Sequence, residues 1–153
     1  MGQSALLLKL ELQSNPEMLC VVRHALGQLA ETLGFSSAEC RAVVLAVDEA
    51  LTNIIRHGYG GEEGHPIRAS FRRIQVALGG RQRKALEIML EDRGKKVDGP
   101  KLCGRPLEEL RPGGLGIHLI NECMDAVEFR RKLGRNQLRL IKLLHGPKAE
   151  MGA

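Results

Sequence analysis

Apolar residues along the chain follow two kinds of spacing, and the changes between them divide the chain into elements. Alternation with a period of two predicts strands at about 6–12, 67–78, 86–92, 127–129 and 138–144. Apolar residues at helical spacing predict helices at about 16–33, 43–59 and 114–124. This order predicts an α+β fold, a two-layer sandwich in which a mostly antiparallel sheet carries three helices on one face.

Capping and turn residues refine the boundaries of these elements. Ser36 or Ser37 can cap the start of the second helix. The alternation in the second strand changes phase at Arg72 and Arg73, which predicts a bulge there. Residues 134–136, Gly-Arg-Asn, are predicted to form the turn between the last two strands.

Chain length, net charge and aromatic content restrict the classes of protein to consider. A length of 153 residues suits one buried core, so we expect a single domain over 1–153 with its core at about 5–145. The formal net charge of +5 suits an anionic ligand or an acidic partner. With no Trp, one Tyr and three Phe, the chain offers few rings for stacking bases, so direct nucleic-acid binding is not expected.

Apolar runs and cysteines indicate the cellular location of the protein. No apolar run is long enough to span a membrane, so we expect no membrane association. The four cysteines show no Cys-x-x-Cys pair and are read as reduced thiols of a cytoplasmic protein.

The second predicted helix carries the first candidate site. Glu49 and Asn53 are four residues apart and share one helix face, and His57 follows one turn later. A carboxamide oxygen is a suitable ligand for Mg²⁺, and a carboxylate one turn away can accept a proton from an attacking hydroxyl. The alternative is a solvated helix edge.

Two further places suit a nucleotide. Asp92 ends a strand and can accept a hydrogen bond from an exocyclic amine such as that of adenine, while Gly94 allows a close approach to the backbone. Gly113, Gly114 and Gly116 open the third helix, where free N–H groups can bind phosphate. The alternatives are an ordinary Asp-x-Gly turn and a flexible helix entry.

Together these segments resemble a known family. In order, 48–59, 91–94 and 113–117 resemble the three nucleotide-binding motifs of GHKL-type ATPase domains. More narrowly, the chain resembles the anti-sigma factor serine/threonine kinases of bacterial partner switching, over about residues 6–144. Lys96 stands where many GHKL proteins have a second glycine, a departure that counts against a histidine kinase more than against a serine kinase.

The resemblance implies roles for individual residues. Glu49 would be the general base, and Asn53 would bind the Mg²⁺ that bridges the ATP phosphates. Asp92 would hold the adenine amine, with Gly94 beside the ring. The remaining expected nucleotide contacts belong to a lid at about 94–113 and the helix after it: Arg105 or Arg111, Gly113, Gly114, Leu115 and Gly116.

The implied function is an ATP-dependent protein serine/threonine kinase of the anti-sigma factor type. It would phosphorylate a Ser or Thr of an antagonist protein and control a sigma factor by partner switching, and the resemblance suggests a homodimer. A second hypothesis is a nucleotide-binding regulatory interaction module without kinase activity. A third, motivated by the charge of +5 alone, is a basic nucleic-acid-binding protein.

Overall fold

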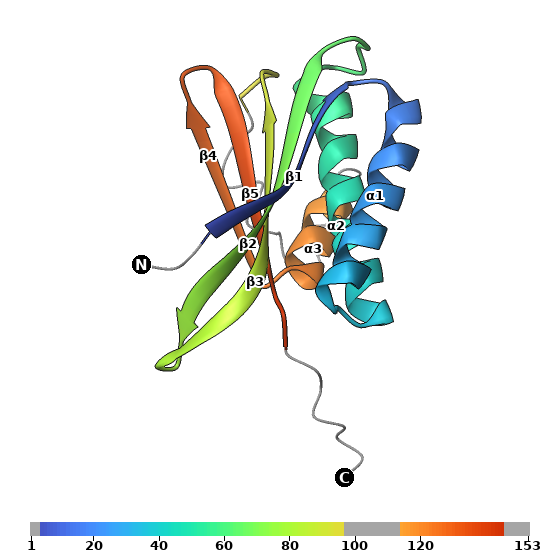
Figure 1. Ribbon diagram of the computed structural model, residues 1–153. Coiled ribbons are helices and arrows are strands. Elements are labelled where there is room, and N and C mark those ends of the chain that lie inside the picture. The colour runs from blue at the N-terminus through green and yellow to red at the C-terminus, as the bar shows by residue number, and fades with distance from the viewer. Residues whose placement is uncertain (1–3, 97–113, 146–153) are drawn as a thin grey trace.

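The computed structural model describes residues 4–96 and 114–145, with the side chains of 114–117 excepted. In this part of the chain an antiparallel sheet of five strands carries three α-helices on one face (Figure 1). The elements are β1 (Ser4–Gln13), η1 (Pro16–Met18), α1 (Leu19–Leu33), α2 (Ser37–Asn53), η2 (Ile54–Gly58), β2 (Pro66–Leu78), β3 (Arg81–Asp92), α3 (Gly114–Cys123), β4 (Ala126–Lys132) and β5 (Arg135–Leu143). The strand order is β1-β2-β3-β5-β4, so the predicted α+β sandwich is confirmed.

The main core lies between the sheet and the helix layer. Leu26 of α1 and Leu51 of α2 pack in one buried cluster with Phe71, Ile88 and Leu140 of the sheet. These side chains are at most 1% exposed. Burying a large apolar side chain stabilises the fold by roughly 1.5–3 kcal/mol, so this cluster fixes which sheet face meets the helices. Residues two apart on each strand then face the same way.

A capping box fixes the first turn of α2. The Ser36 hydroxyl accepts a hydrogen bond from the Glu39 backbone N–H at 3.1 Å, and the Glu39 carboxylate accepts one from the Ser36 N–H at 2.9 Å. Of the two serines that the sequence left open, Ser36 is therefore the cap.

The end of the same helix differs from the prediction. After Asn53 the chain continues as the π-helical segment η2, in which the Tyr59 N–H bonds to the Ile54 carbonyl five residues back at 2.9 Å. A π-turn is wider than an α-turn, so the regular α-helical spacing ends at Asn53. His57 is exposed, whereas Glu49 and Asn53 are partly buried.

The predicted bulge at Arg72 and Arg73 is also wrong. The β2–β3 ladder runs through both residues without a break, and the register shift lies in β1, between Leu6 and Leu8. The phase change in β2 has another cause. Ile74 packs in a second, smaller cluster with Ala85 and Ile141, on the sheet face away from the helices.

The turn between β4 and β5 lies earlier than predicted. Lys132 pairs with Arg135, so the turn consists of Leu133 and Gly134, both with positive φ (53° and 75°). This is the pattern of a two-residue hairpin turn. As a result Asn136, which the sequence placed in the turn, lies inside β5 and is only 2% exposed.

Replacing Ser36 by alanine should lower the free energy of unfolding by about 1 kcal/mol, because the Glu39 N–H loses its capping partner. Chemical denaturation of Ser36→Ala beside Ser37→Ala measures the effect. Ser37 is exposed and makes no capping bond, so the two variants should differ by nearly the whole amount. Equal stabilities would contradict the capping assignment.

Candidate functional site

The Asp92 carboxylate is held in place at the end of β3. Asp92 is 6% exposed, and it continues the row of residues, Ile88 and Leu90, that faces the helices. Its Oδ1 accepts hydrogen bonds from the Gly94 N–H at 2.8 Å and from the Asn136 side-chain amide at 3.0 Å. In the part of the chain that the structure describes, both bonds to this carboxylate use Oδ1, so Oδ2 can accept a bond from a ligand.

Asn136 is the buried partner that sequence reasoning missed. It lies opposite Asp92 in the β3–β5 ladder, and its amide also donates to the carbonyls of Lys95 at 2.9 Å and Gly94 at 3.3 Å. Arg131 of β4 donates to the Asn136 Oδ1 at 2.8 Å, which leaves the amide nitrogen facing Asp92. Asn136 therefore orients the carboxylate and also closes the loop that follows it.

Burial sets the charge behaviour of this aspartate. Desolvation raises the pKa of the Asp92 carboxyl above its ordinary value of 3.8, and the hydrogen bonds from Asn136 and Gly94, together with the charge of Arg131, oppose the rise in pKa. The carboxylate form thus depends on these donors. Among the described residues, Asp92 and Asn136 are two of the three buried polar side chains.

Gly94 is required by a close approach of two backbones. A Cβ added at Gly94 would lie 2.5 Å from the carbonyl oxygen of Gly58 and 2.7 Å from its Cα. The next residue, Lys95, donates its N–H to the same Gly58 carbonyl at 2.9 Å. The segment after β3 thus rests directly on the end of η2. This contact requires glycine before any nucleotide is considered, a reason that the sequence did not reveal.

Tyr59 stabilises the same junction from the other side, and sequence reasoning assigned it no role. Its hydroxyl donates to the Pro66 carbonyl at 2.5 Å and accepts from the Arg93 N–H at 2.8 Å. Its ring stacks on His65 with centroids 4.7 Å apart. The available signal was that the single tyrosine of the chain is the last residue of the first motif.

Glu49 and Asn53 lie on the last turns of α2. Both are partly buried, and within the described residues neither side chain has a hydrogen bond or an ion pair. The helix that carries them leads into Gly58, where an added Cβ would lie 3.5 Å from Oδ1 of Asp92. The structure therefore joins the first two motifs at one end of the sandwich. An unbonded carboxamide oxygen also suits the donor chemistry of Mg²⁺.

The third motif is described only in part. Gly114, Leu115 and Gly116 form the first turn of α3, which packs against α2 (Figure 1). Arg105, Arg111 and Gly113, with most of the predicted lid at 94–113, lie outside the described residues.

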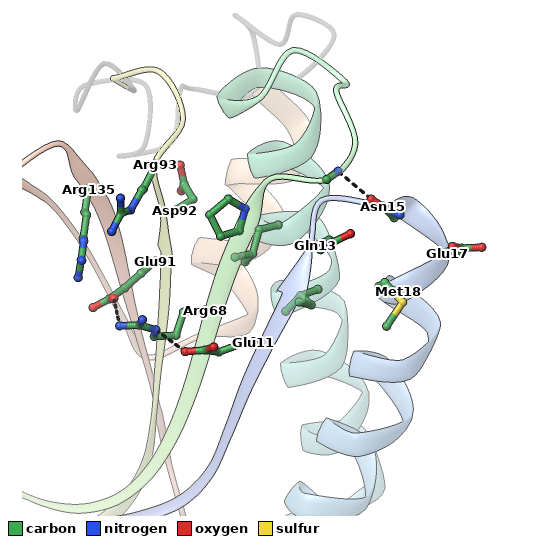
Figure 2. A pocket seen from close by; sticks show the side chains of 14 residues that line it. Glu11, Gln13, Asn15, Glu17, Met18, Arg68, Glu91, Asp92, Arg93 and Arg135 are labelled. Carbon is green, nitrogen blue, oxygen red and sulfur yellow. Dashed lines mark hydrogen bonds and ion pairs between the residues drawn. The ribbon is translucent and has the colours of Figure 1, made fainter.

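A pocket of about 680 Å³ lies over the strand ends near Asp92 (Figure 2). Its lining comes from the ends of β1 and β3, the starts of β2 and β5, and the segment after β1. Among the described residues of the predicted nucleotide site, the lining includes Asp92 but not Glu49, Asn53 or Gly94, so the pocket overlaps that site at Asp92 and extends away from it.

Comparison with known proteins identifies the family. A family model described as "Histidine kinase-like ATPase domain" matches residues 12–142. The chain belongs to this histidine kinase-like ATPase family. Among curated relatives, the serine-protein kinase RsbW of Oceanobacillus iheyensis is 32% identical over 135 residues, which cover 83% of this chain and 80% of the relative. The RsbW of Bacillus pumilus is 28% identical and covers 88% and 84%.

Two solved structures share the fold of this ATPase domain. One contains the RsbU and RsbW domains of a Mycobacterium tuberculosis protein, with a TM-score of 0.57 and 16% identity over 90% of this chain and 33% of that one. The other is the SiaB–SiaC complex from Pseudomonas aeruginosa, with a TM-score of 0.54 and 18% identity over 91% of each chain. At this identity they support the fold alone.

The family and its relatives decide the class of activity. The chain is an ATP-binding protein serine/threonine kinase of the anti-sigma, partner-switching type, as the sequence predicted. Among the described residues, no helix is both long and apolar enough to cross a membrane.

Replacing Gly94 by alanine should destabilise the kinase by about 1–3 kcal/mol, because the new Cβ would overlap the Gly58 backbone. The matched control is Gly58→Ala on the other side of the same contact, where the nearest atom would lie at an ordinary 3.5 Å. Thermal unfolding with and without ATP distinguishes them: Gly94→Ala should lower both the midpoint and the ATP-induced shift. Equal effects of the two substitutions would contradict the close approach.

Lowering the pH should raise the contribution of Asp92 to the stability of the free protein and should weaken the binding of ATP. Because the pKa of Asp92 is raised by folding, the native state gains a proton before the unfolded state does, and the contribution of Asp92 to stability rises as pH falls through the folded pKa. ATP binding should weaken over the same range, which lies above 3.8, because the carboxylate acceptor is lost. Unfolding midpoints with and without ATP, compared with Asp92→Asn, measure both effects. An identical pH dependence in the variant would refute this role.

Proposed function

We propose that this kinase binds Mg²⁺ and ATP between the end of α2, the Asp92 strand end and the start of α3. It then transfers the γ-phosphoryl group to a Ser or Thr of an antagonist protein. The observation that supports this most directly is the contact of Gly58 with Asp92 and Gly94. It holds the helix that carries Glu49 and Asn53 against the carboxylate that would bind adenine.

Each side chain has a role that its surroundings suit. The free oxygen of Asp92 would accept the adenine amine, while Asn136 holds the other oxygen. Glu49, partly buried and unpaired within the described residues, would accept the proton of the attacking hydroxyl. Asn53 would bind Mg²⁺, which neutralises charge on the transferring phosphoryl group. The glycines at 113–116 and Arg105 or Arg111 would contact the phosphates.

The proposed partner is an antagonist protein that loses affinity when phosphorylated. A phosphate adds about two negative charges and would disrupt a contact built around a neutral hydroxyl. The released kinase would then bind a sigma factor. The relatives named RsbW and the SiaB neighbour, solved in complex with SiaC, support the existence of such a partner. We further propose a single cytoplasmic domain over 1–153 that works as a homodimer.

A regulatory binding module without kinase activity is the alternative. It would need the Asp92 site for nucleotide but would have no use for an unpaired Glu49 beside Asn53. The two functions therefore differ in what Glu49 does.

Glu49→Gln should reduce phosphoryl transfer by roughly 10²–10⁴-fold, because the variant keeps the shape of the side chain and loses the proton acceptor. Labelled ATP and antagonist protein from the source cell measure the transfer. The matched control is Glu31→Gln, an exposed glutamate of α1, which should transfer at the normal rate. ATP should still stabilise Glu49→Gln against heat, whereas Asn53→Ala should lose the dependence of that stabilisation on Mg²⁺.

Undiminished transfer by Glu49→Gln would remove Glu49 as the base. Stabilisation by ATP without phosphorylation of any antagonist by the wild-type protein would favour the binding module instead.

A further inference from the structure

The tip of the β4–β5 hairpin and the end of β3 form one cationic surface. We name it the hairpin patch and define it by five residues: Arg93, Arg130, Lys132, Leu133 and Arg135. Figure 2 shows Arg93 and Arg135 on the same side of the strand ends, and both line a groove of about 470 Å³ beside the hairpin tip. Among the described residues the lining includes no carboxylate, and its other members are Lys132, Leu133, Gly134 and Gln137.

Among the described residues, the cations of this patch have no acidic partners, in contrast to other cations on the same sheet. Arg139 contacts Glu87 at 2.8 Å and Glu128 at 3.2 Å. Arg68 likewise lies between two glutamates. Within residues 4–96 and 118–145, the four cations of the hairpin patch form no ion pair. No described carboxylate therefore neutralises their charge.

Leu133 gives the patch an apolar point at its tip. It is 91% exposed, the highest value among the large apolar residues that the structure describes, and its φ is 53°. This turn position favours Asn, Asp or Gly, and exposure to water favours a polar residue. Neither the turn nor the core of this chain therefore explains a leucine here. A contact with another molecule would.

The patch is held at a fixed position relative to the nucleotide site. Arg131, between the exposed cations of β4, donates to Asn136 at 2.8 Å and to the Gly94 carbonyl at 3.2 Å. Asn136 in turn holds Asp92. A partner bound to the hairpin would thus meet a rigid surface adjoining the adenine end of the site.

We propose that the hairpin patch docks an acidic surface of the protein that this kinase phosphorylates, with Leu133 entering an apolar depression on that surface. This proposal rests on the proposed function and adds the contact that selects the substrate. Unpaired cations favour an acidic partner, and an exposed leucine at the tip favours a protein over a nucleic acid. The patch contributes affinity for the protein substrate and takes no part in the chemistry.

Steady-state phosphoryl transfer to the antagonist tests the docking surface. Lys132→Glu/Arg135→Glu should raise the KM for the antagonist by about tenfold or more, because attraction becomes repulsion. The double substitution should leave kcat and the KM for ATP unchanged. Added salt should reduce the difference in antagonist KM between the variant and wild type. The matched control is Arg81→Glu/Lys84→Glu, the same charge change at the opposite end of the sheet, which should keep the wild-type KM.

A second variant separates docking from folding. Leu133→Asn places a residue that suits positive φ in the turn, so its unfolding midpoint should equal or exceed that of wild type. Its KM for the antagonist should nevertheless rise by several-fold, because the apolar contact is lost. A residue with a purely structural role would not give this combination.

The outcomes separate the two proposals. Normal transfer with an unchanged antagonist KM in both variants overturns the docking surface and leaves the kinase function intact. An equal rise in KM in the Arg81→Glu/Lys84→Glu control also overturns it, because general charge would then be the cause. Salt-dependent binding of a duplex DNA probe that the reversal abolishes, with the KM unchanged, assigns the patch to nucleic acid. No transfer by wild type to any antagonist overturns the kinase proposal and the docking surface with it.

Discussion

The contact between the Gly58 and Gly94 backbones is the constraint on which the site depends. At this point the segment after β3 crosses the end of the helix that carries Glu49 and Asn53, closely enough that a Cβ at Gly94 would overlap the Gly58 backbone. The Lys95 N–H donates to the Gly58 carbonyl on one side of the crossing, and the Tyr59 hydroxyl accepts from the Arg93 N–H on the other. This contact ties the proposed base Glu49 and the proposed metal ligand Asn53 on α2 to the position of Asp92.

The crossing also explains why buried polar groups are tolerated here. A buried carboxylate is costly unless it is hydrogen-bonded, and the donors to Asp92 come from the loop itself and from β5. The side-chain amide of Asn136 donates to the Asp92 carboxylate and to the carbonyls of Gly94 and Lys95, so it links the strand end to the loop that follows. Arg131 donates a hydrogen bond to the side-chain oxygen of Asn136. The network belongs to the fold as much as to the proposed site, and it joins the β4–β5 hairpin to the Asp92 strand end.

Local signals predicted much of this arrangement. Apolar periodicity gave every strand and helix in order, and the spacing of Glu49 and Asn53 placed both on α2. The errors came where a tertiary contact decides the local geometry. The need for glycine at 94 follows from the backbone crossing, which brings together residues far apart in the sequence. Asn136 was misplaced because Gly134 and Asn136 look like turn residues, yet Asn136 is in phase with Leu138 and Leu140 of the strand.

The central claim is that the crossing forms one side of the nucleotide site. An amide NMR titration of the full chain with Mg²⁺ and ATP tests this claim most directly. The side-chain amides of Asn53 and Asn136 and the backbone amides of Gly94 and Lys95 lie on different elements, which the structure brings together. We expect these four sets of signals to shift together, with a single apparent Kd. Shifts confined to one element, or unchanged signals at Asn53 and Gly94 under saturating ATP, would contradict the account.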